Sequence, residues 1–391
     1  MIPEEEVEPP LPQLQHLPCE SLSSLPNEII VNCFARISKM YYPSLSLVSK
    51  TFRSLISSPE LYAARIQFKT TEIYLYVSQQ LPIRQCFSLL VNPNPNLTDG
   101  WNKEKSRGNL FVPLFNSCLL YSTSTVVVGS EIYVIGAPMH DISEPSSVVR
   151  VYDFRSDTWR DVPNMKMKRI NAFACLLDDK IYVMGGCTTY YGNSSWFEMF
   201  DIKSQTWRNL PIIPADINIR LAYDWRIDAV EGKIYLRDWG KGWIYDVNEG
   251  RWIVAESSFT YGWSKYWCVI DDVIYCYSVS EYELYEAYRW YDFEARRWKS
   301  VNGLEASMKH YTGTRNIVDR NMVGLVNYGG KLAILWDRID ELGEKKNIWC
   351  AVVTLEKCHD EREIRGKIEW VDVLLTAPKS YEFLRCLAIS I

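Results

Sequence analysis

The spacing of hydrophobic residues divides the chain into two regions. From Ser24 to about Phe68, apolar residues recur at intervals of three and four, which is the pattern of one face of a helix. After Phe68, short segments of alternating apolar and polar residues are separated by turn residues, which is the pattern of β-strands. The sequence therefore predicts a small helical region followed by a larger all-β region.

The helical region is predicted to contain three helices. The first begins at Pro26, because the first helical turn tolerates proline, and the second begins at Pro43. The second ends before Pro59, and a short third helix runs from Glu60 to Ile66. The apolar stripes are Ile29, Cys33 and Ile37 in the first helix and Leu45, Val48, Phe52 and Leu55 in the second. We expect these helices to pack into one compact unit.

A short pattern recurs four times in the β region: an aromatic residue, an Asp, five further residues and a Trp. It occupies residues 152–159, 200–207, 245–252 and 291–298, so the repeat is 45 to 48 residues long. Each copy follows two strand-like segments joined by a pair of tight-turn residues. The four pairs are Gly129-Ser130, Asp178-Asp179, Glu231-Gly232 and Asp271-Asp272. Each repeat therefore holds four strands, named a to d in chain order.

A four-stranded unit of this length cannot bury both of its faces alone, so neighbouring units must stack. Radial stacking of four-stranded sheets makes a β-propeller, in which each sheet is one blade. We expect the repeated Trp, on strand d, to fill the space between adjacent blades. We expect the repeated Asp to accept hydrogen bonds from backbone N–H groups in the turn between strands c and d.

The segments at both ends of the β region complete the predicted count of blades. A fifth hairpin covers residues 322–336, followed by strand c at 348–354, a charged insertion at 357–367 and Trp370 on strand d. Residues 72–78, 86–92 and 109–114 supply strands b, c and d of a first blade, and residues 382–390 supply its strand a. The prediction is a propeller of six four-stranded blades closed by the C-terminal strand.

Composition narrows the class of protein. The 391 residues are 47% hydrophobic and carry a net charge of −5 without a Lys/Arg cluster, which argues against nucleic-acid binding. The eleven Cys form no C-x-x-C pair, as expected for reduced intracellular thiols. No apolar run approaches the roughly 18 residues of a membrane helix. We therefore expect a soluble protein of the cytoplasm or nucleus, without a metal or cofactor.

The motifs of both regions resemble a known family. The segment LPNEIIVNCFARISKMYYPSLSLVSKTFRSLISSPELYAARIQF resembles an F-box, and the repeats resemble kelch repeats, whose double Gly after strand b is kept at Gly185-Gly186. The other repeats depart from the double Gly, with Gly136-Ala137, Asp238, Ser278 and Asp337 at that place. Together the regions resemble the plant F-box/kelch-repeat family. Residues 1–22 are then a disordered acidic, Pro-rich tail, 23–68 a small all-α F-box domain and 69–391 an all-β kelch-type propeller.

The resemblance implies a non-catalytic substrate receptor of a cullin-RING (SCF-type) ubiquitin ligase. The F-box would bind a Skp-type adaptor, and the propeller would recruit a protein target for ubiquitination. Carried over by motif, the adaptor-binding residues are Leu25, Pro26, Ile29, Ile30, Leu45, Val48, Ser49 and Phe52. For any one of these residues, membership of the helical core is the alternative explanation.

The direction of the strands predicts which face of the propeller binds the target. In an antiparallel blade the a–b and c–d turns lie on one face, and the b–c and d–a loops lie on the other. The long loops expected on the second face are 164–170, 187–195, 212–224, 238–242, 257–265 and 280–286. Aromatic and Arg side chains supply most binding hot spots. The candidates there are Arg169, Tyr190, Tyr191, Arg220, Trp239, Trp263, Tyr282 and Tyr285.

Two other classes of function stay open at this point. Some kelch-like propellers are copper oxidases, but the four His of this chain are scattered and only Cys358 and His359 are adjacent. The chain has no P-loop, G-x-G-x-x-G or G-x-S-x-G motif, so nothing predicts a phosphate site or a serine nucleophile. A non-degradative scaffold or a glycan-binding module remains the second alternative.

Overall fold

The computed structural model describes fifteen segments of the chain. They are residues 25–81, 85–91, 109–114, 124–136, 144–156, 158–187, 196–211, 226–238, 241–256, 259, 266–279, 286–312, 320–340, 342–358 and 362–390. The chain divides into two compact units, Met1–Thr71 and Glu72–Ile391. The predicted tail, residues 1–22, lies outside the described residues.

The first unit is helical. Its elements are α1 (Asn27–Phe34), the 3₁₀ turn η2 (Lys39–Tyr41), α2 (Tyr42–Ser46), α3 (Lys50–Ile56) and α4 (Pro59–Phe68). The prediction of one continuous second helix is wrong, because the chain breaks between Ser46 and Lys50. Ser49 causes the break: its backbone is extended, and its hydroxyl accepts a hydrogen bond from the backbone N–H of Phe52 at 3.0 Å, which starts a new helix.

A small apolar core holds these helices together. Ile30 and Phe34 of α1 pack with Phe52 of α3 and Leu61 of α4. The rings of Phe34 and Phe52 meet edge to face with centroids 4.9 Å apart. This geometry favours aromatic pairs beyond the area that they bury.

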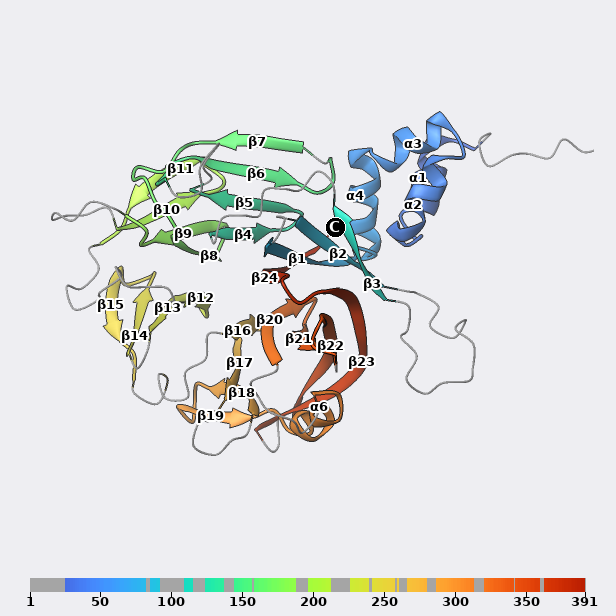
Figure 1. The fold of residues 1–391 in the computed structure, drawn as a ribbon. Coiled ribbons are helices and arrows are strands. Elements are labelled where there is room, and N and C mark those ends of the chain that lie inside the picture. The colour runs from blue at the N-terminus through green and yellow to red at the C-terminus, as the bar shows by residue number, and fades with distance from the viewer. Residues whose placement is uncertain are drawn as a thin grey trace, which may run out of the picture. The chain divides into compact units, whose positions relative to one another are not determined.

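The second unit consists of six four-stranded antiparallel sheets, as predicted, arranged as the blades of a propeller (Figure 1). The strands of the first three blades are β24 (Glu382–Ser390), β1 (Ile73–Leu81), β2 (Gln85–Leu90) and β3 (Leu110–Leu114); β4 (Thr125–Val128), β5 (Glu131–Ile135), β6 (Val149–Asp153) and β7 (Thr158–Val162); and β8 (Phe173–Leu177), β9 (Lys180–Met184), β10 (Phe197–Asp201) and β11 (Thr206–Asn209). Those of the last three are β12 (Arg226–Val230), β13 (Lys233–Asp238), β14 (Lys241–Asp246) and β15 (Arg251–Val254); β16 (Tyr266–Ile270), β17 (Val273–Val279), β18 (Glu286–Asp292) and β19 (Arg297–Ser300); and β20 (Arg320–Tyr328), β21 (Lys331–Ile339), β22 (Lys345–Cys358) and β23 (Glu363–Pro378).

The C-terminal strand closes the propeller, which confirms the prediction. β24 pairs antiparallel with β1, from Ile73 opposite Ser390 to Val77 opposite Cys386. The first strands of the blades also contact one another in a ring, from β4 through β8, β12, β16 and β20 to β24 and back to β4. The first blade is therefore assembled from both ends of the propeller sequence.

The repeated Trp residues pack where the sequence predicts. In four blades the Trp on strand d lies opposite the aromatic residue on strand c, as Tyr152–Trp159, Phe200–Trp207, Tyr245–Trp252 and Tyr291–Trp298, with ring centroids 5.0 to 5.2 Å apart. The indole N–H of Trp207 donates to the carbonyl of Pro163 at 2.7 Å, and that of Trp298 donates to the carbonyl of Phe259 at 3.1 Å. Both acceptors follow the last strand of the preceding blade, so these rings bridge neighbouring blades.

The repeated Asp also acts as predicted. In four blades its carboxylate accepts a hydrogen bond from a backbone N–H of the turn between strands c and d. The shortest such distances are 2.9 Å at Asp153, 2.9 Å at Asp201, 3.0 Å at Asp246 and 2.9 Å at Asp292.

The tight turns between strands a and b share one backbone conformation in three blades. Both central residues have positive φ at 178–179, 231–232 and 271–272, as a type I′ hairpin requires.

The last blade differs from its prediction. Residues 357–358 and 363–367, expected in a charged insertion, belong to strands β22 and β23, which extend beyond the other hairpins. The backbone of the extended part of β23 forms hydrogen bonds with the neighbouring blade. The Asn302 N–H donates to the Ile364 carbonyl at 2.9 Å, and the Gly366 N–H donates to the Asn302 carbonyl at 2.9 Å. A helix absent from the prediction, α6 (Leu304–Thr312), follows β19.

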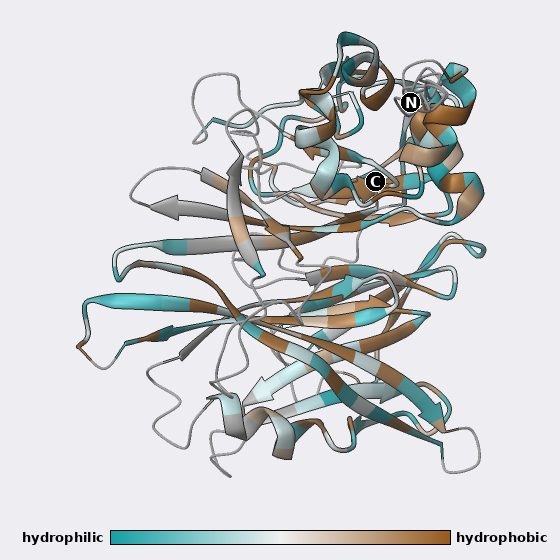
Figure 2. Cartoon of the chain, turned by 90° about the vertical axis from the view of Figure 1, so that its right-hand side faces the viewer, coloured by the Kyte–Doolittle hydropathy of each residue, from teal (hydrophilic) through white to brown (hydrophobic). Residues whose placement is uncertain are grey.

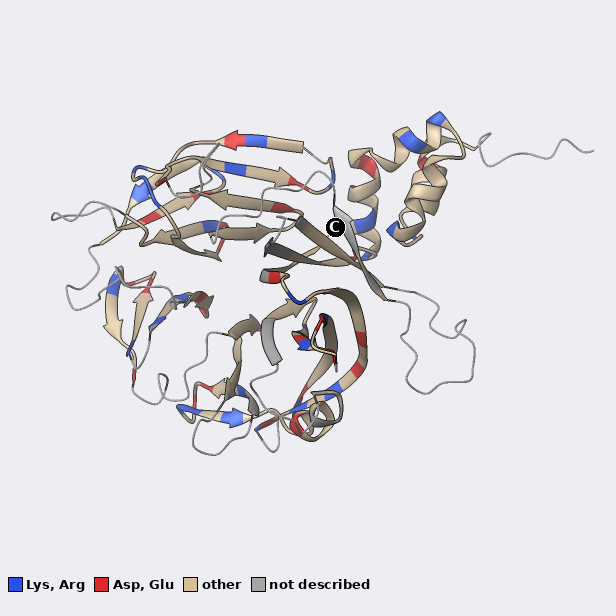
Figure 3. Cartoon of the chain, viewed as in Figure 1, with Lys and Arg blue, Asp and Glu red and all other residues tan. Residues whose placement is uncertain are grey.

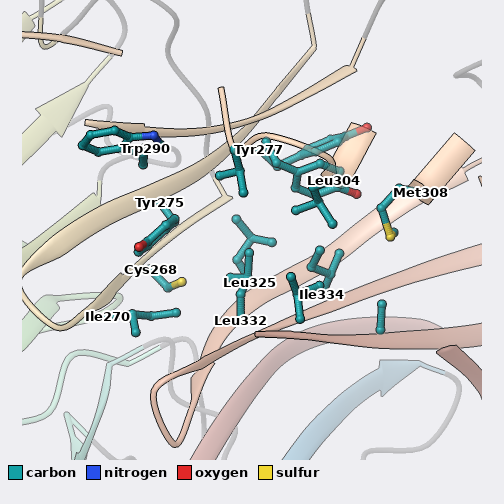
Figure 4. Close-up of a cluster of buried hydrophobic side chains, with 14 of the residues drawn as sticks. Cys268, Ile270, Tyr275, Tyr277, Trp290, Leu304, Met308, Leu325, Leu332 and Ile334 are labelled. Carbon is teal, nitrogen blue, oxygen red and sulfur yellow. The ribbon is translucent and has the colours of Figure 1, made fainter. Parts of the chain in front are cut away.

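Clusters of buried hydrophobic residues join neighbouring blades. Hydrophobic positions, brown in Figure 2, alternate with polar ones along many of the strands. The largest cluster joins the fifth and sixth blades and includes Leu304 and Met308 of α6. Figure 4 shows part of this cluster, in which Tyr275 of β17 lies near Cys268 of β16, and Leu332 and Ile334 of β21 lie near Leu325 of β20. Strand β23 and α6 therefore strengthen one particular junction between blades.

Candidate functional site

Six large apolar side chains of the helical unit are exposed to solvent, and besides Tyr41 and Ile66 they form two pairs. Leu25 and Ile29 lie at the start of α1 and are 37% and 47% exposed. Leu47 and Val48, in the break between α2 and α3, are 79% and 65% exposed. The break itself produces the exposure of Val48, because the capping geometry at Ser49 interrupts the helix that would have turned Val48 inward. We call these four residues the exposed apolar set.

The structure sorts the eight predicted adaptor-binding residues into three groups. Leu25, Pro26, Ile29 and Val48 are exposed, Leu45 and Ser49 are half-buried, and Ile30 and Phe52 are buried. Ile30 and Phe52 lie in the helical core, and Ser49 caps α3. Leu47 is 79% exposed, more than Leu25, Ile29 or Val48, and it is not among the residues carried over by motif.

Most of the predicted target-binding residues lie outside the described residues. They are Tyr190, Tyr191, Arg220, Trp239, Trp263, Tyr282 and Tyr285. One predicted loop, 238–242, is corrected in part: Asp238 ends β13, and Lys241, its partner, begins β14.

The prediction that Arg169 contacts the target from an exposed position is wrong. Its side chain is fully buried, and its guanidinium lies 2.8 Å from the carboxylate of Glu198, which is also fully buried. A buried carboxylate requires a partner of opposite charge or several hydrogen-bond donors, and Arg169 supplies the charge. Nothing in the spacing of the sequence pairs a loop Arg with a Glu on β10.

The Arg169–Glu198 pair connects two segments that enter the predicted binding face. The Glu198 carboxylate accepts hydrogen bonds from the backbone N–H groups of Lys166, at 2.8 Å, and Met167, at 3.2 Å, in the d–a connection. Arg169 donates to the carbonyls of Gly185, at 2.6 Å, and Trp196, at 3.1 Å. These two residues flank the b–c segment, so the pair holds its ends against the d–a connection.

The second glycine of the Gly185-Gly186 pair is required by the close approach of the same d–a connection. The backbone of Gly186 has φ +72°, and a Cβ there would lie 2.3 Å from the carbonyl oxygen of Ile170. The Ile170 N–H donates to the Gly186 carbonyl at 2.8 Å. Only glycine permits this close approach of the two backbones.

Four of the described cysteines lie in the hydrophobic clusters of the propeller core. Burial raises the pKa of Cys175, Cys268 and Cys350 well above the ordinary value, and that of Cys276 to about 12. These thiols are therefore protonated at neutral pH, and the thiolate is the nucleophilic form. Within the described segments, no three His, Cys, Asp or Glu side chains are arranged to hold a metal ion.

Lys and Arg are interspersed with Asp and Glu over the described strands and helices (Figure 3). Among the described helices, none is long and apolar enough to span a bilayer.

Comparison with known proteins identifies both units. Residues 86–375 match the family described as FKB95, Kelch-repeats domain, and residues 22–63 match the F-box domain. The chain is 49% identical to F-box/kelch-repeat protein At4g29370 of Arabidopsis thaliana over 406 residues, which cover all of both chains. It is 41% identical to F-box/kelch-repeat protein At5g39560 and 40% identical to F-box/kelch-repeat protein At4g19870 of the same plant, with 95% of this chain and 93% of each relative covered. The chain therefore belongs to the plant F-box/kelch-repeat protein family.

Proposed function

We propose that this protein is a substrate-receptor subunit of a cullin-RING (SCF-type) ubiquitin ligase. Its F-box unit binds a Skp-type adaptor, and its propeller recruits a protein target for ubiquitination. The observation that carries the proposal is the exposed apolar set on a helical unit that matches the F-box. The chain has no catalytic role in this proposal, and ubiquitin transfer belongs to its partners.

The exposed apolar set suits a protein partner on energetic grounds. Burial of apolar surface stabilises a complex by roughly 25 cal/mol per Å² before the costs of association are counted. Leu47 and Val48 are among the most exposed large apolar residues of the described chain, although their helical unit has its own core. Pro26 adds a rigid residue at the start of α1, so this part of the surface loses little conformational freedom when it binds a partner.

The propeller is the proposed target-binding unit. The b–c and d–a segments carry the predicted aromatic and Arg contacts, namely Tyr190, Tyr191, Arg220, Trp239, Trp263, Tyr282 and Tyr285. Arg169 is removed from this set because it is buried. Its pair with Glu198 supports these contacts instead, since it fixes the two ends of the segment that contains Tyr190 and Tyr191.

The experiment that tests this function is affinity purification of the full chain from plant cells, followed by lifetime measurements on each captured protein. A ligase receptor co-purifies with the adaptor, and its target persists longer in cells that lack the receptor. Replacement of Tyr190 and Tyr191 by Ala is expected to abolish target capture and to spare adaptor capture. Capture of a target whose lifetime is unchanged would instead favour a non-degradative scaffold, and capture of glycans alone would favour a lectin. We place this activity in the cytoplasm or nucleus.

A further inference from the structure

A fully buried arginine lies among the helices of the F-box unit. Arg65, on α4, has 1% of its surface exposed. One terminal nitrogen, Nη1, donates to the carbonyl of Ile37 at 2.8 Å and to the hydroxyl of Tyr42 at 3.0 Å. The other, Nη2, donates to the carbonyl of Thr70 at 2.5 Å. A charged side chain in this position is costly unless it is held by such hydrogen bonds.

The partners of Arg65 are linked to the end of α1. The Tyr42 hydroxyl donates to the carbonyl of Phe34 at 3.0 Å, and the Thr70 hydroxyl donates to the carbonyl of Ala35 at 2.6 Å. The last carbonyls of a helix have no partner within that helix. A positive charge is also favourable there, because the helix dipole places partial negative charge at the C-terminus. Arg65 and the hydroxyls of Tyr42 and Thr70 therefore cap the end of α1 together.

The same network fixes the start of α2. Helix α2 has five residues, which is too short to be stable by itself, and Tyr42 is its first residue. Leu47 and Val48 directly follow α2, whereas Leu25 and Ile29 lie at the opposite end of α1. The two halves of the exposed apolar set therefore belong to different elements, and the Arg65–Tyr42–Phe34 chain of hydrogen bonds connects those elements.

We propose that Arg65 is a positioning residue for adaptor binding. It holds α2 and the following Leu47 and Val48 in a fixed relation to α1, so that both halves of the exposed apolar set meet one rigid partner surface. The inference rests on the proposed function and adds a residue that itself makes no contact with the adaptor. Because binding to a rigid surface weakens when one half must first be ordered, the loss of Arg65 weakens adaptor binding.

A buried arginine that served packing alone would behave differently. An apolar side chain of similar length is often tolerated in place of a buried charge when the surroundings repack. Such a replacement would change stability but not the order of α2. The test must therefore separate the fraction of folded protein from the affinity of the folded protein.

The experiment uses the purified full chain, the variants Arg65→Met, Arg65→Lys and Tyr42→Phe, and a purified Skp-type adaptor as the probe. Leu61→Ala is the matched control, because Leu61 is fully buried on the same helix but lies outside the hydrogen-bond network. Adaptor affinity is measured for each variant and corrected for its folded fraction. Hydrogen exchange at residues 42–49, of which all but Pro43 have an amide hydrogen, reports the order of α2 and the following break.

We expect Arg65→Met to weaken adaptor binding about tenfold per folded molecule and to speed exchange at residues 42–49. Arg65→Lys should recover part of the affinity, and Tyr42→Phe, which keeps the buried ring, should show a smaller loss in the same direction. Leu61→Ala should bind like the wild type once corrected. Should Arg65→Met fail to fold, Tyr42→Phe decides the question by the same two measurements.

Equal affinity per folded molecule for Arg65→Met, Tyr42→Phe and Leu61→Ala, with unchanged exchange at residues 42–49, would overturn the inference. A wrong proposed function would give a different result, because the wild-type chain would then show no adaptor binding at all. Exchange at residues 42–49 would in that case still show whether Arg65 orders α2.

Discussion

At the scale of single residues, the repeated Asp shows how a charge is used inside the propeller. Hydrogen bonds and ion pairs keep the pKa of Asp292 below its ordinary value: burial alone would raise it, but the Ala295 N–H and the Lys299 ammonium, 2.6 Å away, outweigh burial. The pKa of Asp201 is also lowered, mainly by the backbone N–H of Ser204. These carboxylates therefore stabilise the fold in their charged form.

This arrangement predicts acid sensitivity with a defined sign. Because the folded pKa of Asp292 lies below its unfolded value near 3.9, its stabilising effect is complete above about pH 4 and is lost as the pH falls through the folded pKa. Asp292→Asn should therefore be less stable than the wild type at pH 7, and the difference should shrink towards pH 3. Urea unfolding across this range measures it. A difference that stays constant down to pH 3 would contradict the account.

The buried Arg169–Glu198 pair carries a second prediction. Arg169→Met leaves the Glu198 carboxylate buried without its cation, which should cost about 3 to 5 kcal/mol of unfolding free energy. Lys203→Met is the control, because the Lys203–Asp179 pair is mostly exposed and should contribute less than about 1 kcal/mol. Urea denaturation of both variants measures the two losses. Similar small losses in both would show that the buried pair does not hold the loops.

The roles of the repeated Trp and Asp could be predicted from the sequence, because a pattern that recurs four times specifies one environment. The role of Arg169 could not. A single Arg in a connecting segment looks like an exposed hot spot, and its partner Glu198 occurs 29 residues later on another strand. Pairing of such distant charges depends on packing between blades, which the repeat pattern does not encode.

At the scale of elements, two differences from the sequence analysis have local causes. The apolar period of 43–55 fits one helix, but the capping hydroxyl of Ser49 divides it and exposes Val48. The polar residues of 357–367 fit an insertion, but residues 357–358 and 363–367 pair as the ends of two long strands, and Ile364 and Gly366 bond to Asn302 of the neighbouring blade. In both cases hydrogen bonds outweigh the hydrophobic pattern.

The junction between this hairpin and α6 predicts the effect of one substitution. A Cβ at Gly366 would lie 2.9 Å from Val301 Cγ1 and 3.3 Å from Leu304 Cβ, so Gly366→Val overpacks the junction. We expect a loss of about 1 to 3 kcal/mol in unfolding free energy. Lys367→Ala, at the exposed neighbouring position, should change it by less than about 0.5 kcal/mol. Equal stability of the two variants would argue against a tightly packed junction.

At the scale of the whole propeller, closure by β24 is predicted from the sequence and observed in the structure. The unpaired end strand of the sequence has its partner in β1, and β24 contacts β4 and β20 as well. Without β24, the edge of β1 would be open and the ring of first strands broken, and open edges favour aggregation.

Truncation after Tyr381 is therefore expected to lower the melting temperature by about 10 °C or more. Thermal unfolding followed by circular dichroism measures the change. A full chain extended by a Gly-Ser tail after Ile391 controls for alteration of the C-terminus and should melt like the wild type. A truncated chain that melts like the full chain would place the closure elsewhere.

Adaptor binding is the claim on which the proposed role depends, and isothermal titration of the purified chain with a Skp-type adaptor tests it most directly. The wild type should bind with one-to-one stoichiometry. Val48→Asp should weaken binding at least about tenfold, because it buries a charge in the interface, and should leave the unfolding curve unchanged, because Val48 is exposed. Absence of binding by the wild type, or equal binding by a chain that begins at Glu72, would contradict the account.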